Sequence, residues 1–256
     1  MQKNHKQICS YLIFWPVSRV VKMPPFHGGD QGFDTPTGYL FCIILSMKIF
    51  FDVGAELGLD SIPFARNNPD SVVYAFEPNP HMIKHLTEQS QGLDNYFIIP
   101  FAVSDYHGFS NFNICTEHPG ICSLLEFDDS GVQNWNGYRI GTDFPIHTDE
   151  KVEVEVIRLD HFIKENEITK IDYFHCDTQG SDLNVLKGMG DYIHLINEGQ
   201  VEAEFQQKSF YQNQNNYKET MSFLIENGFE IVKINPEGGW RECNIIFKKC
   251  PLSFSI

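Results

Sequence analysis

Basic residues are scarce in this sequence. Its 256 residues include 19 Lys and Arg against 34 Asp and Glu, so the formal net charge is −15. Proteins that bind nucleic acid need a basic stripe to displace counterions from the phosphates, and anionic lipid attracts similar clusters. The sequence contains no such stripe. The composition therefore argues against nucleic acid and lipid surfaces as partners, and it favours a small-molecule substrate.

Paired cysteines are also missing. The seven cysteines are scattered, odd in number and never spaced as C-x-x-C. A disulfide framework and a structural zinc site both depend on cysteine pairs, so neither is expected. Scattered free thiols are typical of a reducing compartment, which predicts a cytoplasmic protein.

No apolar run is long enough to span a bilayer. Two runs occur early, at residues 8–21 and 39–51, but Pro16 interrupts the first and Lys48 lies inside the second. The basic start "MQKNHK" resembles that of a signal peptide, yet no small-residue cleavage site follows. We expect residues 1–46 to be an irregular or disordered leader. An ordered extension, a targeting segment and a true start at Met47 are the alternatives.

From Met47 onward, short apolar runs alternate with helical segments. This alternation predicts an α/β fold, doubly wound, with one parallel sheet and helices on both faces. Residues 108–158 break the pattern, since they are rich in Gly, Asn and aromatic residues and end in the alternating segment "KVEVEVIRL". They are expected to form a β-rich insertion within a single domain over residues 47–250.

The segment "FFDVGAELGLD", Phe50–Asp60, predicts a strand that ends in a tight turn and opens a helix. Gly54 lets the backbone turn sharply, and Gly58 lets the helix approach a ligand. Ligands of open α/β sheets bind beyond the carboxyl ends of the strands. Glu77 lies at that end of the next strand, where an acidic residue can accept both hydroxyls of a ribose. The two features together predict a nucleoside site.

The charge of this turn indicates which nucleoside-containing cofactor the site would bind. Pyrophosphate loops read G-x-G-x-x-G, whereas Glu56 here occupies the second glycine position and would repel phosphates. S-adenosylmethionine carries a sulfonium and an amino group, which suit the carboxylates of Asp52 and Glu56. Glu56 could instead serve only the dipole at a helix N-terminus. The expected cofactor is S-adenosylmethionine.

Five motifs in order resemble the FkbM-type methyltransferases, which are S-adenosylmethionine-dependent enzymes of the Rossmann-like class I. The motifs are "DVGAELG", "AFEPNP", "AVSDYHG", "VIRLDHFI" and "IDYFHCDTQGSDLNVLKGM". The resemblance spans about residues 50–247. It implies a Rossmann-like, mostly parallel seven-stranded sheet with one antiparallel edge strand, for which residues 244–248 are the candidate. It also implies methyl transfer, and we expect O-methylation of a hydroxyl on a sugar or other small metabolite.

Three positions depart from the family's pattern. Glu56 replaces the usual Asn, His175 the usual Lys, and Asp182 the usual Glu. These departures affect substrate and catalytic detail more than cofactor binding. Two alternatives stay open: a catalytically inactive cofactor-binding or scaffold member of the same fold, and an NAD-dependent oxidoreductase.

The segment "PFAVSD" after the third strand is expected to contact the adenine. Phe101 and Ala102 would form an apolar wall, while Ser104 or Asp105 would accept the exocyclic amine; an ordinary loop is the alternative. The complete set of expected cofactor-binding residues is Asp52, Gly54, Ala55, Glu56, Gly58, Glu77, Pro78, Phe101, Ala102 and Asp105.

Methyl transfer to a hydroxyl requires removal of the acceptor's proton. Asp177, at the carboxyl end of the fourth strand, is the first candidate; it could also fix the acceptor, contact the methionine amino group or cap the next helix. Glu204 ends the fifth strand. His175 lies on the same side of its strand as Asp177 and could accept the proton. The alternative is a buried histidine whose hydrogen bonds serve only the core. The expected catalytic residues are Asp177, Glu204 and His175.

Other polar and aromatic residues are candidates for the same region. Gln179, Asp182 and Glu202 could line the active-site mouth, and Trp135 and Tyr138 of the insertion could select the substrate.

No metal is expected. His81 and His85 are one helical turn apart but have no third ligand in the sequence pattern. An ion between Asp177 and Glu204, as some O-methyltransferases use, is the alternative.

Overall fold

The structure is a computed structural model that describes residues 47–129, 132, 146–205, 209–237 and 241–251. The expected leader, residues 1–46, lies outside the described residues, as do Trp135 and Tyr138.

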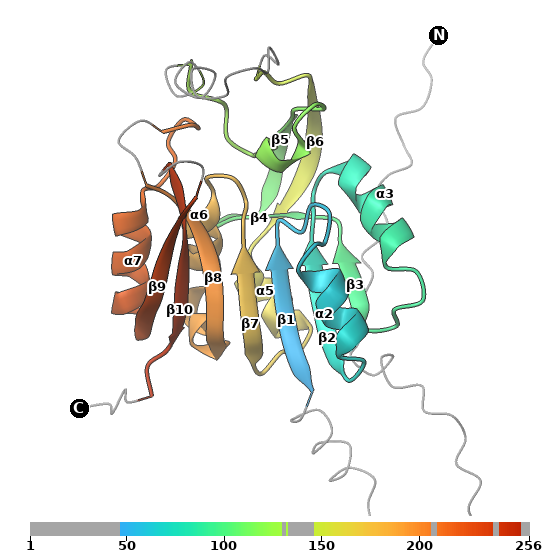
Figure 1. The fold of residues 1–256 in the computed structure, drawn as a ribbon, viewed down its shortest axis with the longest axis vertical. Coiled ribbons are helices and arrows are strands. Elements are labelled where there is room, and N and C mark those ends of the chain that lie inside the picture. The colour runs from blue at the N-terminus through green and yellow to red at the C-terminus, as the bar shows by residue number, and fades with distance from the viewer. Residues whose placement is uncertain (1–46, 130–131, 133–145, 206–208, 238–240, 252–256) are drawn as a thin grey trace, which may run out of the picture.

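A seven-stranded sheet forms the centre of the molecule (Figure 1). Its strands, in spatial order, are β3 (Tyr96–Ile99), β2 (Ser71–Phe76), β1 (Lys48–Val53), β7 (Ile171–Cys176), β8 (Ile196–Glu204), β10 (Glu242–Lys249) and β9 (Phe229–Glu237). The pairs from β3 to β8 are parallel, and β10 is antiparallel to both of its neighbours. This confirms the predicted Rossmann-like, mostly parallel α/β sheet.

The antiparallel strand lies one place inside the edge. Residues 244–248 belong to β10, as predicted, but β10 pairs with β8 on one side and β9 on the other, so β9 is the edge strand. The helix α7 (Tyr217–Glu226) crosses from β8 to β9 and leaves a space one strand wide. The chain then returns through β10, which hydrogen-bonds along both of its sides and fills that space.

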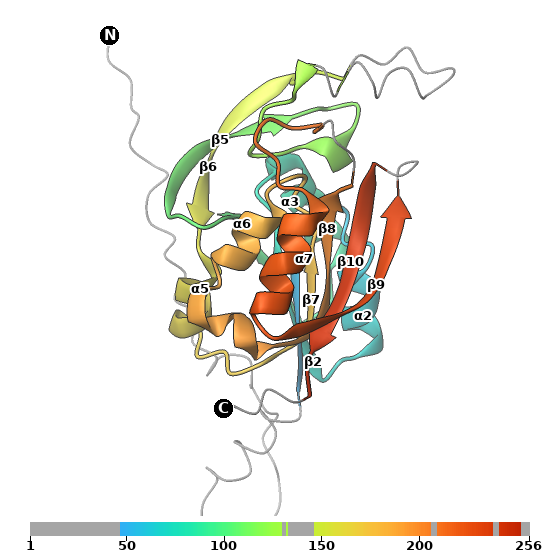
Figure 2. The same ribbon diagram turned by 90° about the vertical axis from the view of Figure 1, so that its left-hand side faces the viewer.

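Helices cover the sheet on both faces (Figure 2). Besides α7 they are α2 (Ser61–Asn67), α3 (Pro80–Gln89), α5 (Leu159–Glu165) and α6 (Asp182–Lys187), with two 3-10 turns, η2 (Pro119–Ile121) and η3 (Gly190–Leu195). The alternation of β1 divides the core, because successive side chains of a strand point to opposite faces. Phe50 packs in the cluster that holds Ile62 of α2 and Leu86 of α3. Phe51 packs in the larger cluster with residues of α5, α6 and α7. None of the helices in the described part of the chain has the length and apolar character needed to cross a membrane.

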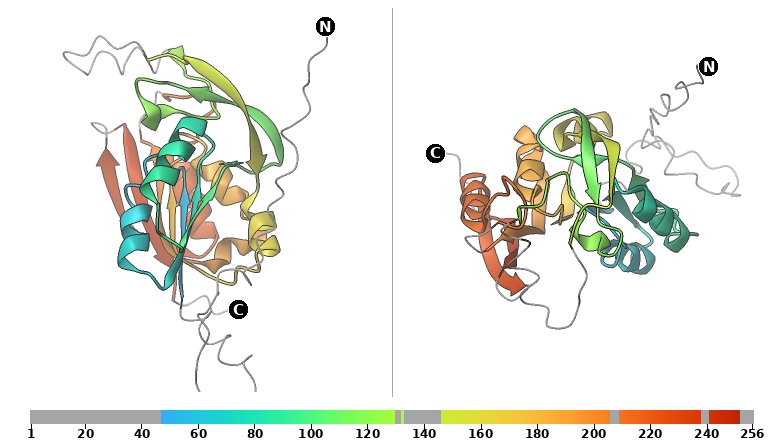
Figure 3. Two further views of the ribbon diagram at one scale, coloured as in Figure 1. Left: turned by 90° about the vertical axis from the view of Figure 1, so that its right-hand side faces the viewer. Right: turned by 90° about the horizontal axis from the view of Figure 1, so that it is seen from above.

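The predicted β-rich insertion forms a second, small sheet. Its strands are ordered β4 (Ala102–Val103), β6 (Glu150–Ile157) and β5 (Gly108–Ile114), with β6 antiparallel to β5. The strands β5 and β6 rise above the carboxyl ends of the central strands (Figures 1 and 3). Phe112, Ile114 and Val156 give this sheet its own apolar cluster. The insertion is therefore placed to cover whatever binds at that end of the large sheet.

Candidate active site

A pocket lies at the carboxyl ends of β1, β2 and β7, and it encloses about 630 Å³ of empty space when the solvent at its open side is included. Seven of the thirteen residues predicted to bind the cofactor or to act in catalysis line it: Gly54, Glu56, Glu77, Pro78, Phe101, Ala102 and Asp177. Gln179, a candidate for the active-site mouth, also lines it, whereas Asp182 and Glu202 do not. The other six lie outside its lining: Asp52, Ala55, Gly58, Asp105, His175 and Glu204. The carboxyl ends of parallel strands meet at one edge of a sheet, which explains why motifs distant in sequence converge here.

Gly54 allows the loop after β1 to lie directly against the loop after β7. Its φ is +85°, a left-handed value that favours glycine. A Cβ atom at this position would lie 1.9 Å from the carbonyl oxygen of Asp177. Gly58 has a different task, since its Cβ would collide with the side chains of Ile62 and Leu86 inside the core. Ala55 is also buried in that core, so the turn is shaped by packing as much as by the cavity.

The Glu56 side chain reaches across the cavity to the insertion. Its carboxylate oxygen Oε1 would lie 3.3 Å from a Cβ built on Gly120 of η2. Its backbone φ of +44° is left-handed, which is uncommon for a residue with a side chain and typical of functional loops. Burial, with a further contribution from the charge of Asp177, raises the pKa of Glu56, while His85 opposes the shift. Two carboxyl groups thus influence each other inside the cavity.

Glu77 is buried, and each of its carboxylate oxygens is held by the backbone. Oε2 accepts from the N–H of Glu56 at 2.8 Å, and Oε1 accepts from the N–H of Asn79 at 2.8 Å. Burial raises the pKa of Glu77 to about 7 although both backbone donors oppose the shift. Each oxygen keeps a further lone pair. The carboxylate can therefore accept two ribose hydroxyls with its position already fixed.

Asp52 and His175 form a pair beneath the turn instead of lining the cavity. They lie opposite each other in the β1–β7 ladder, and His175 Nδ1 is 2.8 Å from Asp52 Oδ1. Asp52 is 2% exposed. Burial lowers the pKa of His175, but the hydrogen bond and the charge of Asp52, aided by Asp177 and Asp60, raise it overall to about 9. Each of the two side chains thus has the other as a hydrogen-bond partner, and neither residue belongs to the cavity lining.

Asp177 lines the cavity at the end of β7. Its backbone N–H donates to the carbonyl of Val53 at 2.9 Å, which fixes it beside the turn after β1. The side-chain amide of Gln179 donates to Asp177 Oδ1 at 2.6 Å and to Glu202 Oε2 at 3.0 Å. The N-cap residue of α6 is Ser181 rather than Asp177, and the buried carboxylate of Asp182 holds the preceding loop by accepting from the N–H groups of Thr178 and Gly180. Asp177 is thus a lining residue of the cavity whose carboxylate is held by Gln179.

Glu204 is buried at the end of β8, outside the cavity lining. It accepts from the N–H of Phe210 at 3.3 Å. This contact ties the end of β8 to the loop that returns over it, so the carboxylate has a partner without reaching the cavity.

Sequence reasoning missed the residues that the insertion supplies. Phe112, Pro119, Gly120, Cys122 and Leu124 line the cavity on the side opposite the large sheet. It also missed Tyr211, whose buried hydroxyl lies 2.9 Å from Gln179 Oε1 and from the carbonyl of Ile121. Phe112 lies in β5, and Pro119 and Gly120 lie in η2, whereas Cys122, Leu124 and Tyr211 lie outside the named helices and strands. No local sequence signal marked any of them as part of a site.

Asp105 lies outside the cavity lining. Its carbonyl oxygen accepts from Arg158 Nη1 at 2.7 Å, and its side chain is exposed and accepts from the Ser104 hydroxyl at 3.4 Å. Phe101 and Ala102, which were predicted to form an apolar wall for the adenine, belong to the cavity lining.

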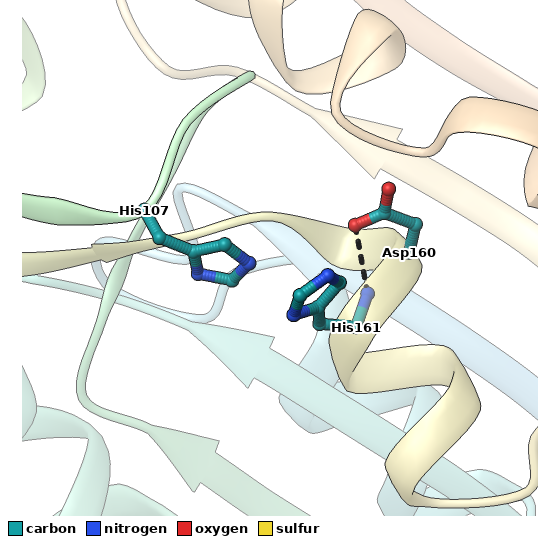
Figure 4. A group of neighbouring side chains, drawn as sticks. All are labelled: His107, Asp160 and His161. Carbon is teal, nitrogen blue, oxygen red and sulfur yellow. Dashed lines mark hydrogen bonds between the residues drawn. The ribbon is translucent and has the colours of Figure 1, made fainter.

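Among the described residues, one group of His and Asp side chains has the spacing of metal ligands: His107, Asp160 and His161 (Figure 4). It lies apart from the cavity lining. Asp160 is already engaged, because both of its oxygens accept from Arg158 Nε at 3.1 Å and Oδ1 also accepts from the N–H of His161. The group does not bear on the chemistry of the cavity.

Comparison with known proteins agrees with this geometry. The family described as Methyltransferase FkbM domain matches residues 52–231, more than half of the chain. The chain is 26% identical over 192 residues to "2-O-methyltransferase NoeI" of Sinorhizobium fredii, which covers 74% of this chain and 75% of that protein. It is 25% identical over 150 residues to "Hexuronic acid methyltransferase AglP" of Haloferax volcanii, which covers 58% of this chain and 53% of that protein. The chain therefore belongs to the FkbM family of methyltransferases, as its five motifs predicted, and S-adenosylmethionine is its cofactor.

Proposed function

We propose that this protein transfers a methyl group to a hydroxyl of a sugar. One observation carries the proposal: the Asp177 carboxylate, held by Gln179, lines the same cavity as Glu77. A candidate base and a candidate ribose anchor thus share one cavity. The names of the two relatives, a 2-O-methyltransferase and a hexuronic acid methyltransferase, support a sugar hydroxyl as the acceptor.

The residues of the cavity fit S-adenosylmethionine. Glu77 offers free lone pairs on two fixed oxygens for the ribose hydroxyls. Phe101 and Ala102 offer an apolar wall to the adenine. Glu56 offers negative charge to the sulfonium and the amino group, whereas the same charge disfavours the pyrophosphate of a nicotinamide cofactor. When bound, S-adenosylmethionine supplies a methyl carbon activated by its sulfonium.

The chemistry requires positioning and one proton acceptor. The acceptor oxygen attacks the methyl carbon in line, so a C–O bond forms as the S–C bond breaks. The hydroxyl proton passes to Asp177, whose Oδ1 atom is kept in place by Gln179 Nε2. Ala102 and Val103 of β4 and Phe112 of β5 line the cavity, so the small sheet would limit the access of water to it.

We also propose that the acceptor is a small molecule and that the protein is cytoplasmic. A small-molecule acceptor agrees with the acidic composition, and a cytoplasmic location agrees with the free cysteines of the described residues, which include the buried Cys115, Cys122, Cys176 and Cys243.

Two measurements test the function. Calorimetric titration of S-adenosylmethionine and S-adenosylhomocysteine into the full chain should give micromolar binding, which Glu77→Ala abolishes. Incubation with methyl-labelled S-adenosylmethionine and a panel of sugars should then give labelled, methylated sugar. Binding without transfer to any sugar, while another class of hydroxyl compound is methylated, would contradict the proposed acceptor. Binding that Glu77→Ala leaves unchanged would contradict the proposed ribose site.

A further inference from the structure

The side-chain amide of Gln179 holds two carboxyl groups at once. Its Nε2 atom donates to Asp177 Oδ1 at 2.6 Å and to Glu202 Oε2 at 3.0 Å. Burial, and after it the charge of Asp177, raises the pKa of Glu202 well above its usual range, so Glu202 is neutral at pH 7. Asp177 is the proposed base, and the ionised form of a carboxyl group gains most from a donor. The direction in which the Gln179 amide points therefore matters for the reaction.

The oxygen end of this amide faces a buried tyrosine. Gln179 Oε1 lies 2.9 Å from the hydroxyl of Tyr211, which also lies 2.9 Å from the carbonyl oxygen of Ile121. The hydroxyl has one proton, so it donates to either of these oxygens. Burial raises the pKa of Tyr211 well above its usual range, so the hydroxyl keeps this proton at neutral pH. Among the described residues, it is the donor that the structure places within reach of the Gln179 amide oxygen.

Tyr211 is held in place by contacts other than the one with Gln179. Its side chain is buried, and its ring stacks on that of Phe127 with centroids 5.5 Å apart. Its backbone forms an isolated antiparallel bridge with Phe127, and its N–H donates to Gln214 Oε1 at 3.2 Å. Tyr211, Phe127 and Gln214 all lie outside the cavity lining. The position of the hydroxyl is therefore set from outside the cavity.

The backbone at Gln179 is shaped to meet this hydroxyl. The φ of Gln179 is +55°, a left-handed value that is uncommon for a residue with a side chain and typical of functional loops. Its carbonyl oxygen accepts from the Ser123 hydroxyl at 2.7 Å. At the next residue, Gly180, a Cβ atom would lie 3.0 Å from Cδ2 of Tyr211, so glycine allows the ring to approach. Gln179 is thus held both at its backbone and at the oxygen of its side chain.

We propose that Tyr211 is a positioning residue for the methyl transfer: its hydroxyl holds the amide oxygen of Gln179 and thereby keeps the amide nitrogen on Asp177. The inference rests on the proposed function, because Asp177 is the base of that reaction. Without the hydroxyl, a buried amide oxygen loses its donor, which destabilises this orientation of the side chain. Gln179 then turns to satisfy its oxygen elsewhere, and Asp177 loses the donor that fixes its carboxylate. Cofactor binding is not affected, because Tyr211 does not line the cavity.

A double-mutant cycle on the full chain tests whether Tyr211 acts through Gln179. Methyl transfer is followed with labelled S-adenosylmethionine and the sugar of the panel that is methylated fastest. Tyr211→Phe should lower kcat roughly 10- to 100-fold and should change the dissociation constant of S-adenosylhomocysteine less than about twofold. When Gln179→Ala is already present, the same substitution should change kcat less than about twofold, because the amide through which it acts is gone. An equal loss of kcat in both backgrounds would overturn the inference.

Tyr96→Phe is the matched control. The Tyr96 side chain is also buried, its hydroxyl lies 3.0 Å from Ser61 Oγ, and neither residue lines the cavity. The variant removes a buried tyrosine hydroxyl and its hydrogen bond, as Tyr211→Phe does, but it should keep kcat within about twofold of the wild-type value. A loss of kcat as large as that of Tyr211→Phe would trace the effect to weakened packing and would overturn the inference.

The side-chain amide protons of Gln179 test the contact without any acceptor. In isotope-labelled protein, nuclear magnetic resonance identifies their signals by comparison with Gln179→Ala. They should exchange slowly with solvent in the wild type and at least on the order of 10-fold faster in Tyr211→Phe. Wild-type protons that exchange as fast as those of an exposed glutamine would overturn the inference even if the variant does not fold, and so would unchanged exchange in folded Tyr211→Phe. Transfer to no sugar would instead contradict the proposed function, while the amide signals still decide the contact.

Discussion

His175 and Asp52 face each other across the ladder between the two central strands, with His175 Nδ1 2.8 Å from Asp52 Oδ1. Both side chains are largely buried, at 14% and 3% exposure. Burial alone would lower the pKa of His175, but Asp52 and the neighbouring carboxylates raise it to about 9. At neutral pH His175 is therefore protonated, and it lies directly under the turn that shapes the cavity.

Replacing His175 should reveal the contribution of this pair to stability. His175→Gln leaves the buried Asp52 without its charged partner, so the free energy of unfolding at pH 7 should fall by about 3 kcal/mol. Because the folded-state pKa of His175 is raised, the contribution is fully present below about pH 6.5 and is lost as the pH rises through 9. Urea unfolding at pH 6.5, 8 and 10 measures the difference. A gap between wild type and variant that stays constant across this range would contradict the prediction, and Asp52→Asn with His175→Gln should recover part of the loss.

Gly54 should be far less replaceable than another glycine of similar backbone conformation. Gly54→Ala places a Cβ 1.9 Å from the carbonyl oxygen of Asp177, whereas Gly92, with φ +81°, has nothing within 4 Å. Gly92→Ala should lower the free energy of unfolding by about 1 kcal/mol, from backbone strain alone. Gly54→Ala should lower the free energy of unfolding by more than about 3 kcal/mol. It should also weaken cofactor binding, because the backbone of one of the two loops must move. Chemical unfolding and calorimetry compare the two, and equal costs would show that the two loops separate easily.

Cofactor affinity should depend on pH through Glu77. The pKa of Glu77 is raised to about 7, and only its ionised form accepts both ribose hydroxyls. The affinity for S-adenosylhomocysteine should therefore rise ~10-fold between pH 6 and pH 8. The stability of the cofactor-free protein should change in the opposite direction, because a raised carboxyl pKa stabilises the fold below about 4.5 and that contribution is lost as the pH rises through 7. Calorimetry on wild type and Glu77→Gln measures the first effect; a variant with the same pH dependence would show that another group titrates.

Replacing Asp177 should lower the turnover number strongly and should change the affinity for the cofactor little. Asp177→Asn removes the proton acceptor and keeps the size of the side chain, so kcat should fall by roughly 10²- to 10⁴-fold. The dissociation constant of S-adenosylhomocysteine should change less than about threefold, because no cofactor anchor is lost. Asp70→Asn, an exposed site beside the amino end of β2, is the control and should alter neither value. Full turnover by Asp177→Asn would exclude it as the base.

Much of the candidate site could be predicted from the sequence because strand ends are local features. Gly54, Glu77 and Asp177 each follow a recognisable apolar run, and a parallel sheet brings the carboxyl ends of such runs together. The contacts of Glu202 could not be predicted, since the bridge through Gln179 joins two strand ends by a loop of no regular pattern. The same limit applies to Tyr211.

The sequence by itself determined the alternation of strands and helices, the parallel sheet and the family, because apolar periodicity and short motifs act within a few residues. The tertiary structure alone decided that β10 lies between β8 and β9, and that Asp52 turns to His175 rather than to the cavity. Both outcomes depend on which distant segments become neighbours. Burial then decides which charged side chains need a partner. Neither the pairing of distant segments nor the burial of a side chain can be read from a single position of the sequence.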